Sequence, residues 1–307
     1  MLPHYFTVSS EINRALNLTL PTVALESTVV THGLPRPQNL SLARDMETVV
    51  REEGAVPATV GVLNGKVCVG LSEADLDALA NDPKARKISQ RDFAIAAVKE
   101  ENGGTTVAGT MFAAHKAGIQ VFATGGIGGV HRESDFDISN DLQALASIPM
   151  IVICAGAKAI LDLPATLEYL ETMSVPVVGY QTLAFPAFYS RDSGLKANVR
   201  LDTPEEIVKL AQAHWEMGMR SAVLVAQPVP PGDEIPKEEM DYAIIQASQE
   251  AVKQGKHGQE LTPFLLQRLN ELTNGRTLRS NLALLLNNAR LAAQVAKALA
   301  MTKRRTI

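Results

Sequence analysis

The sequence of 307 residues has little cysteine, few aromatic side chains and no excess of positive charge. Two residues are cysteine and 5% are aromatic, which excludes a small scaffold held together by disulfides. The 29 basic and 33 acidic residues give a net charge of -4, and the one dense basic cluster is 303–305, so nucleic acid is not expected as a partner. Cys68 and Cys154 lie in apolar runs, so we expect buried, reduced thiols in place of a disulfide.

Long apolar runs and an export signal are missing as well. The apolar stretches 149–157 and 280–300 are too short or too polar to span a bilayer, which takes about 20 apolar residues. Residues 1–18 have no basic segment followed by an apolar one, the pattern of a signal peptide. We therefore expect a cytoplasmic protein that does not bind membranes.

Apolar residues make up 46% of the chain and charged residues 20%, which is typical of a folded globular protein. Short runs rich in valine and isoleucine alternate with longer amphipathic segments. This alternation predicts a three-layer α/β/α fold around a mixed, largely parallel sheet. The runs expected to form strands are 22–30, 56–63, 105–109, 120–123, 150–154, 176–179 and 221–226.

Local signals add detail to this sheet. Asn64-Gly65 separates two apolar runs and favours a type I′ turn, which joins antiparallel strands, so the sheet is not expected to be purely parallel. Ser72 and Asp75 match a capping box for a helix that extends through Leu79. Segments 40–53 and 94–102 have the spacing of helices.

No linker rich in serine, glycine or proline divides the chain, so we expect a single domain, 1–307. Residues 227–236 contain four prolines and one glycine, and we interpret them as a loop inside that domain. The chain beyond this loop is expected to be almost wholly helical. Residues 277–299 carry leucine and alanine at spacings of three and four, which predicts a long C-terminal helix packed on the rest of the fold.

Lys158 is the first candidate for chemistry. It follows the apolar run 150–154 and lies among alanine and glycine residues that leave room for a substrate. Ligands of open α/β sheets bind beyond the carboxyl ends of the strands, and a poorly hydrated amine there can add to a carbonyl. The alternative, which position alone favours, is a surface lysine at the start of a helix.

Glu26 interrupts the apolar residues of 22–30. Burial raises the pKa of a carboxyl group, and a proton donor that works near neutral pH needs such a shift. His32 belongs to the same wall in this interpretation. The alternative is a structural carboxylate paired with a buried arginine or with backbone amides.

Residues 124–131 contain four glycines and end at His131. Backbone N–H groups of such a segment can converge on a phosphate. The segment matches neither the dinucleotide-binding fingerprint nor a Walker A loop, and a tight turn without a chemical role is the alternative.

Asp135, Asp137 and Asp141 alternate with other residues, so an extended segment would place these acids and Ser139 on one side. Oxygen ligands of this kind suit Mg²⁺ or Mn²⁺, and a solvated acidic loop is the alternative. Asn281 borders the apolar stripe of the last helix and could orient a sugar hydroxyl; the alternative is an interior amide bonded to the backbone.

Several segments together resemble the pseudouridine-5′-phosphate glycosidase family, which includes indigoidine synthase A-like proteins. The resemblance covers nearly the whole chain in order: 24–28, 32–35, 124–131, 137–139, 154–158, 176–180, 185–189, 262–266, 280–283 and 287–289.

This resemblance implies a metal-dependent enzyme, typically a homotrimer, that reversibly converts pseudouridine 5′-phosphate and water into uracil and ribose 5-phosphate. It implies a Schiff base between Lys158 and C1′ of the sugar, proton donation by Glu26, and manganese bound at Asp137. The positions implied to bind the substrate are Lys87, Val107, His131, Ser139, Asn140, Asp141 and Asn281.

The implied chemistry suits the bond that breaks, which joins C1′ to a carbon of the uracil ring. That carbon is a poor leaving group, so a pair of carboxylates alone would not suffice, whereas a lysine imine together with protonation of the carbon would. Two alternatives stay open: a Schiff-base lyase acting on another sugar phosphate or C-nucleotide, and a sugar-phosphate binding protein without turnover. The positions that depart from the family's pattern, and so bear on the substrate, are Gln90, Ala184, Gln227, Gln259 and the short loop 131–137.

Overall fold

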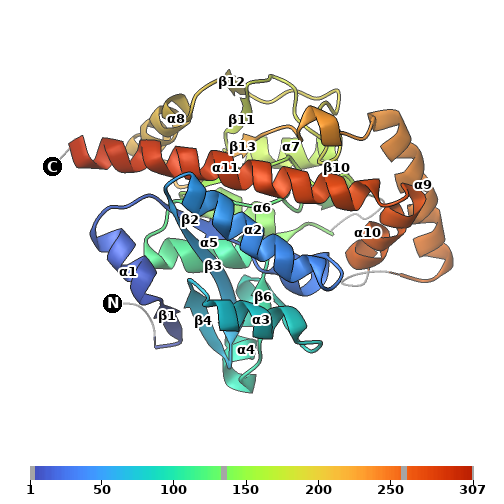
Figure 1. Ribbon diagram of the computed structural model, residues 1–307. Helices are drawn as coiled ribbons and strands as arrows, with labels where there is room; N and C mark the ends of the chain where they lie inside the picture. The colour runs from blue at the N-terminus through green and yellow to red at the C-terminus, as the bar shows by residue number, and fades with distance from the viewer. Residues whose placement is uncertain (1–3, 133–136, 257–260, 306–307) are drawn as a thin grey trace.

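The computed structural model describes residues 4–132, 137–256 and 261–305. It has a central sheet with helices on both faces (Figure 1), so the three-layer α/β/α prediction is confirmed. Asp135 and Gln259 lie outside the described residues.

The sheet is mixed and mostly parallel, as the sequence predicts. Seven neighbouring strands, from β3 to β12 in the order below, run parallel to one another, whereas β4 is antiparallel to β3. Strands β5 (Arg86–Ile88) and β6 (Gly103–Thr105) extend the sheet beside β3. The main order is β1 (Phe6–Val8), β4 (Lys66–Val69), β3 (Val56–Leu63), β2 (Thr22–Leu25), β7 (Val121–Ala123), β9 (Ile151–Cys154), β13 (Val223–Ala226), β11 (Val177–Tyr180) and β12 (Val199–Leu201).

Helices cover the two faces in separate groups. Helices α2 (Gln38–Glu52), α8 (Pro204–Glu216) and α11 (Arg276–Arg305) pack together on one face. Helices α5 (Val107–Ala117), α6 (Asn140–Ser147) and α7 (Leu163–Thr172) form the other layer. The remaining helices are α1 (Ser10–Asn17), α3 (Glu73–Asn81), α4 (Phe93–Lys99), α9 (Lys237–Lys253) and α10 (Leu261–Leu272).

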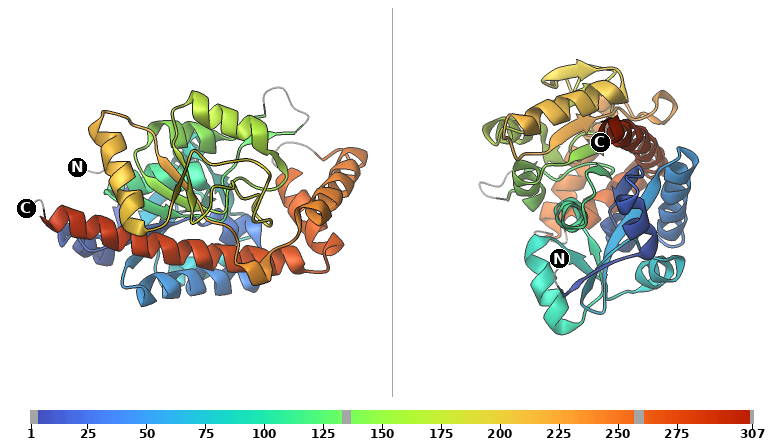
Figure 2. Two further views of the ribbon diagram at one scale, coloured as in Figure 1. Left: turned by 90° about the horizontal axis from the view of Figure 1, so that it is seen from above. Right: turned by 90° about the vertical axis from the view of Figure 1, so that its left-hand side faces the viewer.

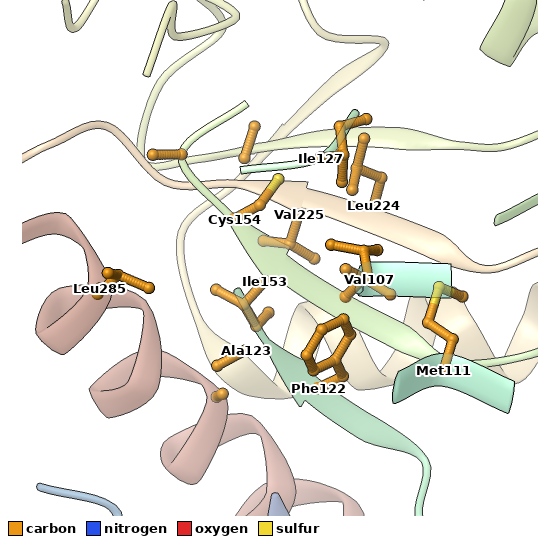
Figure 3. Packing of buried hydrophobic residues seen from close by; sticks show 14 of the residues in the cluster. Val107, Met111, Phe122, Ala123, Ile127, Ile153, Cys154, Leu224, Val225 and Leu285 are labelled. Carbon is orange, nitrogen blue, oxygen red and sulfur yellow. The ribbon is translucent and has the colours of Figure 1, made fainter. Parts of the chain in front are cut away.

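Helix α11 runs across the whole molecule, with α1 and its own C-terminal end at one side and α9 and α10 at the other (Figures 1 and 2). The apolar stripe predicted for this helix is confirmed over most of its length, because Leu285, Ala289 and Ala292 are buried against the sheet. On the opposite face of the strands, Phe122 of β7 points toward Val107 and Met111 of α5 (Figure 3). The sheet thus has a buried apolar core on both faces.

Two local predictions are confirmed. Asn64 and Gly65 have φ angles of 47° and 73° between paired residues of β3 and β4, as a type I′ turn requires. Ser72 and Asp75 form both hydrogen bonds of a capping box at the start of α3. Both cysteines are free: Cys154 is buried, and Cys68 is half-buried. Among the described helices, none is long and apolar enough to cross a membrane.

Two predicted strands are wrong in their extent. The strand expected over 22–30 ends at Leu25. The chain then turns, with the carbonyl of Ser27 accepting hydrogen bonds from the N–H groups of Val30 and Thr31, and a short π-helix, Val29–Gly33, forms there. The strand expected over 105–109 ends at Thr105. There Thr106 caps helix α5 by accepting a hydrogen bond from the N–H of Gly109 at 3.2 Å, which turns the chain into a helix.

Candidate active site

The sheet order brings three loops together at one edge. Strand β7 lies between β2 and β9, and all three are parallel, so their carboxyl ends are neighbours. From β2 the chain continues to β3 on one side, and it later returns on the other side through β7 and β9. Such a reversal of strand order opens a crevice for ligands. Glu26 follows β2, Thr124 follows β7, and Lys158 follows β9.

A cavity opens at this edge and has two lobes, which share Glu26, Thr28, Lys87 and Lys158. The Asn281 lobe has a volume of about 360 Å³ and is lined by His32, Gly125, Gly126, Phe188, Asn281 and Leu285, among others. The Ser139 lobe has a volume of about 570 Å³. The residues proposed from sequence that line the Ser139 lobe are Glu26, Lys87, Val107, His131, Asp137, Ser139, Asn140, Asp141 and Lys158.

Glu26 lies where the two lobes meet, and its side chain is half-buried. The hydroxyl of Thr124 donates a hydrogen bond to its Oε1 atom. Burial raises the pKa of Glu26 above its ordinary value, and this effect outweighs the lowering by the positive charge of Lys158 and by the Thr124 hydrogen bond. The shift has the direction that a proton donor needs, as the sequence predicts.

Lys158 lies in the loop between β9 and β10 (Leu161–Asp162) and lines both lobes. Its N–H donates to the carbonyl of Ile127 at 3.1 Å, and its own carbonyl accepts from Leu161 at 3.0 Å. Helix α7 begins only at Leu163, so the alternative of a surface lysine at a helix start is wrong. Lys158 thus faces the cavity from a loop that is fixed on both sides.

The same loop needs a glycine at position 156. Gly156 has a φ of +86°, and a Cβ atom there would lie 2.2 Å from the carbonyl oxygen of Pro186. Another residue would both strain the backbone and push the following chain away from β9.

Lys87, at the middle of β5, is the second amine of the cavity. Burial lowers its pKa, the positive charge of Lys158 lowers it further, and the negative charges of Asp141 and Glu26 act in the opposite direction. Burial and Lys87 also lower the pKa of His32, which lines the Asn281 lobe. The cavity therefore holds partly dehydrated amine and imidazole groups beside a carboxyl group.

Asp141 is buried, and both of its oxygens are occupied by main-chain donors. Oδ1 accepts from the N–H of Ala108 at 3.0 Å, and Oδ2 accepts from the N–H of Gly128 at 2.8 Å. The expected row of oxygen ligands on one extended segment is therefore wrong, because helix α6 begins at Asn140 and turns Asp141 into the protein. Asp141 ties the start of α5 to the glycine-rich segment.

The prediction that residues 124–131 cradle a phosphate is also wrong for most of their N–H groups, because these groups donate to acceptors within the protein. The N–H groups of Thr124 and Ile127 donate to carbonyls of the β9 strand and loop. The N–H of Val130 donates to the hydroxyl of Thr166, and that of His131 to the carbonyl of Asp137. The anion that this segment binds is the carboxylate of Asp141.

Asp137 borders the Ser139 lobe with a half-exposed carboxylate, and its Oδ2 lies 3.9 Å from Nδ1 of His131. Within the described parts of the chain, no three His, Cys, Asp or Glu side chains group around a point that could hold a metal ion. A half-exposed carboxylate such as that of Asp137 suits a hydrated Mg²⁺ or Mn²⁺ ion, which keeps most of its water ligands, better than a fully coordinated metal.

Two residues of the site were missed from sequence. In the sequence Thr124 is only the first residue of the glycine-rich segment 124–131, although a hydroxyl directly after a buried strand is a usable signal. Phe188 lines the Asn281 lobe with a φ of +62°, and its N–H donates to Ala155 at 3.0 Å. No local pattern indicates that Phe188 reaches the loop that carries Lys158.

The fold and the cavity define an α/β protein with an amine and an enclosed carboxyl group at the switch point of its parallel sheet. A family model described as indigoidine synthase A-like protein matches residues 11–298, and the chain belongs to this family.

Relatives and solved structures agree over almost the full length. The chain is 52% identical to a pseudouridine-5′-phosphate glycosidase of Solibacter usitatus, over 95% of this chain and 98% of that one. It is 53% identical to one of Paracoccus denitrificans, over 97% and 100%. An indigoidine synthase A-like protein from Thermotoga maritima superimposes with a TM-score of 0.89 at 38% identity, covering 98% of this chain and 99% of the other. The prealnumycin C-glycosynthase AlnA, in complex with ribulose 5-phosphate, superimposes with 0.91 at 37% identity and 99% coverage of both chains.

The two hydrogen bonds of Asp141 generate a prediction about stability. In Asp141→Asn the side-chain NH₂ group must face a main-chain N–H, so one donor loses its acceptor, and we expect a loss of about 2 kcal/mol in the free energy of unfolding. Urea denaturation measures the loss. Asp45→Asn, at an exposed position of α2, is the control and should change stability by less than about 0.5 kcal/mol. Equal effects of the two substitutions would contradict the assignment.

Proposed function

We propose that this protein catalyses the reversible cleavage of pseudouridine 5′-phosphate by water to uracil and ribose 5-phosphate. The observation that carries the proposal is the shared cavity, in which Lys158 and Glu26 approach from the ends of β9 and β2. The names of the relatives and the ribulose 5-phosphate complex of AlnA support a sugar-phosphate substrate.

Lys158 forms the bond to the sugar. Its amine bonds to C1′ while the bond from C1′ to the ring oxygen breaks, and that oxygen takes up the proton that the amine releases. The sugar is then an open chain attached to the protein, with the uracil still on C1′. The small residues around Lys158 leave space for this tetrahedral carbon.

Glu26 supplies the proton for the departure of uracil. Glu26 protonates C5 of the uracil ring, and the nitrogen lone pair of Lys158 forms a C1′=N double bond. The electrons of the C1′–C5 bond return to the uracil ring as that bond breaks. Water then adds to the iminium, ribose 5-phosphate leaves as its aldehyde, and Glu26 regains a proton. The raised pKa of Glu26 extends to higher pH the range in which the carboxyl group holds that proton.

The remaining residues bind and orient the substrate in this proposal. Lys87, His131, Ser139 and Asn140 offer charged and polar groups to the sugar phosphate in the Ser139 lobe, and Asn281 acts from the other lobe. Val107 and Asp141 shape the Ser139 lobe from α5 and α6. A homotrimer follows from the family resemblance alone, a cytoplasmic location was expected from the sequence pattern, and both stay predictions.

Asp137 is proposed to hold a divalent cation, Mn²⁺ or Mg²⁺, with water as its main partner. A cation at this border of the Ser139 lobe would neutralise phosphate charge and help to bind the substrate. The half-exposed carboxylate fits a hydrated ion of this kind.

The covalent step is tested by trapping. Ribose 5-phosphate and borohydride should leave a stable mass adduct on the peptide that contains Lys158, because borohydride reduces the imine to an amine. Lys84→Ala removes another lysine that lines the cavity and should leave the adduct unchanged. An adduct of the same yield in Lys158→Ala would rule out Lys158, and no adduct at all in the wild type would favour a binding protein without turnover.

The proton donor is tested by separating trapping from turnover. Glu26→Gln cannot transfer a proton, so release of uracil should fall by about 10² or more, while trapping of ribose 5-phosphate persists. Wild-type cleavage needs protonated Glu26 and should fall as the pH rises through its raised pKa. Glu47→Gln, which changes another carboxyl group whose pKa burial raises, is the control and should keep full turnover. Normal release of uracil by Glu26→Gln would place the donor elsewhere.

The metal is tested by binding as well as by activity. A chelator should abolish release of uracil and Mn²⁺ should restore it, and Asp137→Asn should bind Mn²⁺ at least about 10-fold more weakly in calorimetry. Asp45→Asn should bind Mn²⁺ like the wild type. Full activity of protein shown by elemental analysis to be free of metal would contradict the proposal.

A further inference from the structure

Thr124 contacts the proposed proton donor from a position that is fixed on several sides. Its side chain is fully buried, and its hydroxyl donates to Oε1 of Glu26. Its N–H donates to the carbonyl of Ile153 at 3.0 Å, and its carbonyl accepts from Nδ2 of Asn288 at 2.8 Å. Thr124 is therefore anchored to β9 and to α11, and its hydroxyl has little freedom to turn elsewhere.

This contact distinguishes the two oxygens of Glu26. A threonine hydroxyl has one proton, and when it donates that proton to Oε1, this oxygen acts as the acceptor, as the carbonyl oxygen of a protonated carboxyl group does. Among the residues that the structure describes, no hydrogen bond occupies Oε2. When Glu26 is protonated, the proton is thus favoured on Oε2, the oxygen left open at the meeting point of the two lobes.

We propose that Thr124 is a positioning residue, which holds Glu26 so that its transferable proton is carried by Oε2 and faces the substrate. The inference rests on the proposed role of Glu26 as proton donor and adds a residue to it. Thr124 does not touch the reacting atoms in this account. It acts by fixing the orientation of the carboxyl group, and a small error in the position of a reacting group can cost a large part of the rate.

The electrostatic surroundings of Glu26 determine in which direction its pKa moves when the Thr124 hydroxyl is removed. The charged groups that act on it are Lys158 beyond β9, Lys87 on β5 and Asp141 on α6. The Thr124 hydrogen bond lowers the pKa of Glu26, against the stronger raising effect of burial. Loss of the hydroxyl should therefore raise the pKa further, so protonated Glu26 should persist to higher pH.

The test compares substitutions that separate the hydroxyl from the shape of the side chain. Thr124→Val keeps the shape and removes the hydroxyl, Thr124→Ser keeps the hydroxyl, and Thr22→Val alters a buried threonine at the other end of β2 as the control. The kcat for release of uracil and its pH profile are measured, together with KM, borohydride trapping of ribose 5-phosphate, and the melting temperature.

We expect kcat of Thr124→Val to fall about tenfold or more, with KM and trapping close to wild type. The alkaline limb of its kcat profile should move to higher pH. Thr124→Ser should restore most of the rate and return the alkaline limb to its wild-type pH. Thr22→Val should change neither the rate nor the pH profile. If valine disturbs the packing, as a lowered melting temperature would show, Thr124→Ala repeats the test without a branched side chain.

Three outcomes would overturn the inference. The first is a wild-type rate and pH profile in Thr124→Val, and the second is a loss in Thr124→Ser as large as in Thr124→Val, which would indicate packing. The third is parallel loss of trapping and turnover, which would indicate a general disturbance of the cavity. Failure of the proposed function itself is a separate result, because the wild-type protein would then release no uracil at all.

Discussion

A carboxyl group and two amines line one cavity, and the rest of the site depends on how their charges are balanced. Burial raises the pKa of Glu26 and lowers that of Lys87, so the enclosure drives both groups toward their neutral forms. The positive charge of Lys158 acts on both groups: it lowers the pKa of Lys87 further and limits the rise in the pKa of Glu26. A neutral acid next to a lysine is the combination that bond formation to a sugar carbon and protonation of a ring carbon require.

The scaffold holds these groups with main-chain contacts more than with ion pairs. The carboxylate of Asp141 accepts from Ala108 and Gly128, which joins the start of α5 to the loop after β7. Gly128 is needed for this approach, because a Cβ atom there would lie 2.2 Å from Oγ of Ser139. Hydrogen bonds from main-chain amides satisfy the buried charge of Asp141. The walls of the Ser139 lobe are therefore fixed before any ligand binds.

The sequence was sufficient for the layered fold, the type I′ turn at Asn64-Gly65 and the placement of Lys158 after a buried strand, whereas Glu26 was expected inside the strand 22–30 and instead follows β2. Each depends on a local pattern or on the general rule that ligands gather at the carboxyl ends of parallel strands. Local patterns did not suffice for Asp141, whose partners come from positions 108 and 128, or for Phe188, which reaches the loop after β9 from a distant segment. The expected strand at 105–109 was wrong because Thr106 caps a helix there, which outweighs the strand propensity of its neighbours.

The central claim is that Lys158 bonds to C1′ before the bond between C1′ and uracil breaks, and that Glu26 is needed only for the break. The most direct measurement is the intact mass of Glu26→Gln after incubation with pseudouridine 5′-phosphate and denaturation without a reducing agent. The account predicts a covalent adduct that retains both sugar and uracil, located by peptide mapping on Lys158. Unmodified protein, or an adduct on another residue, would contradict it.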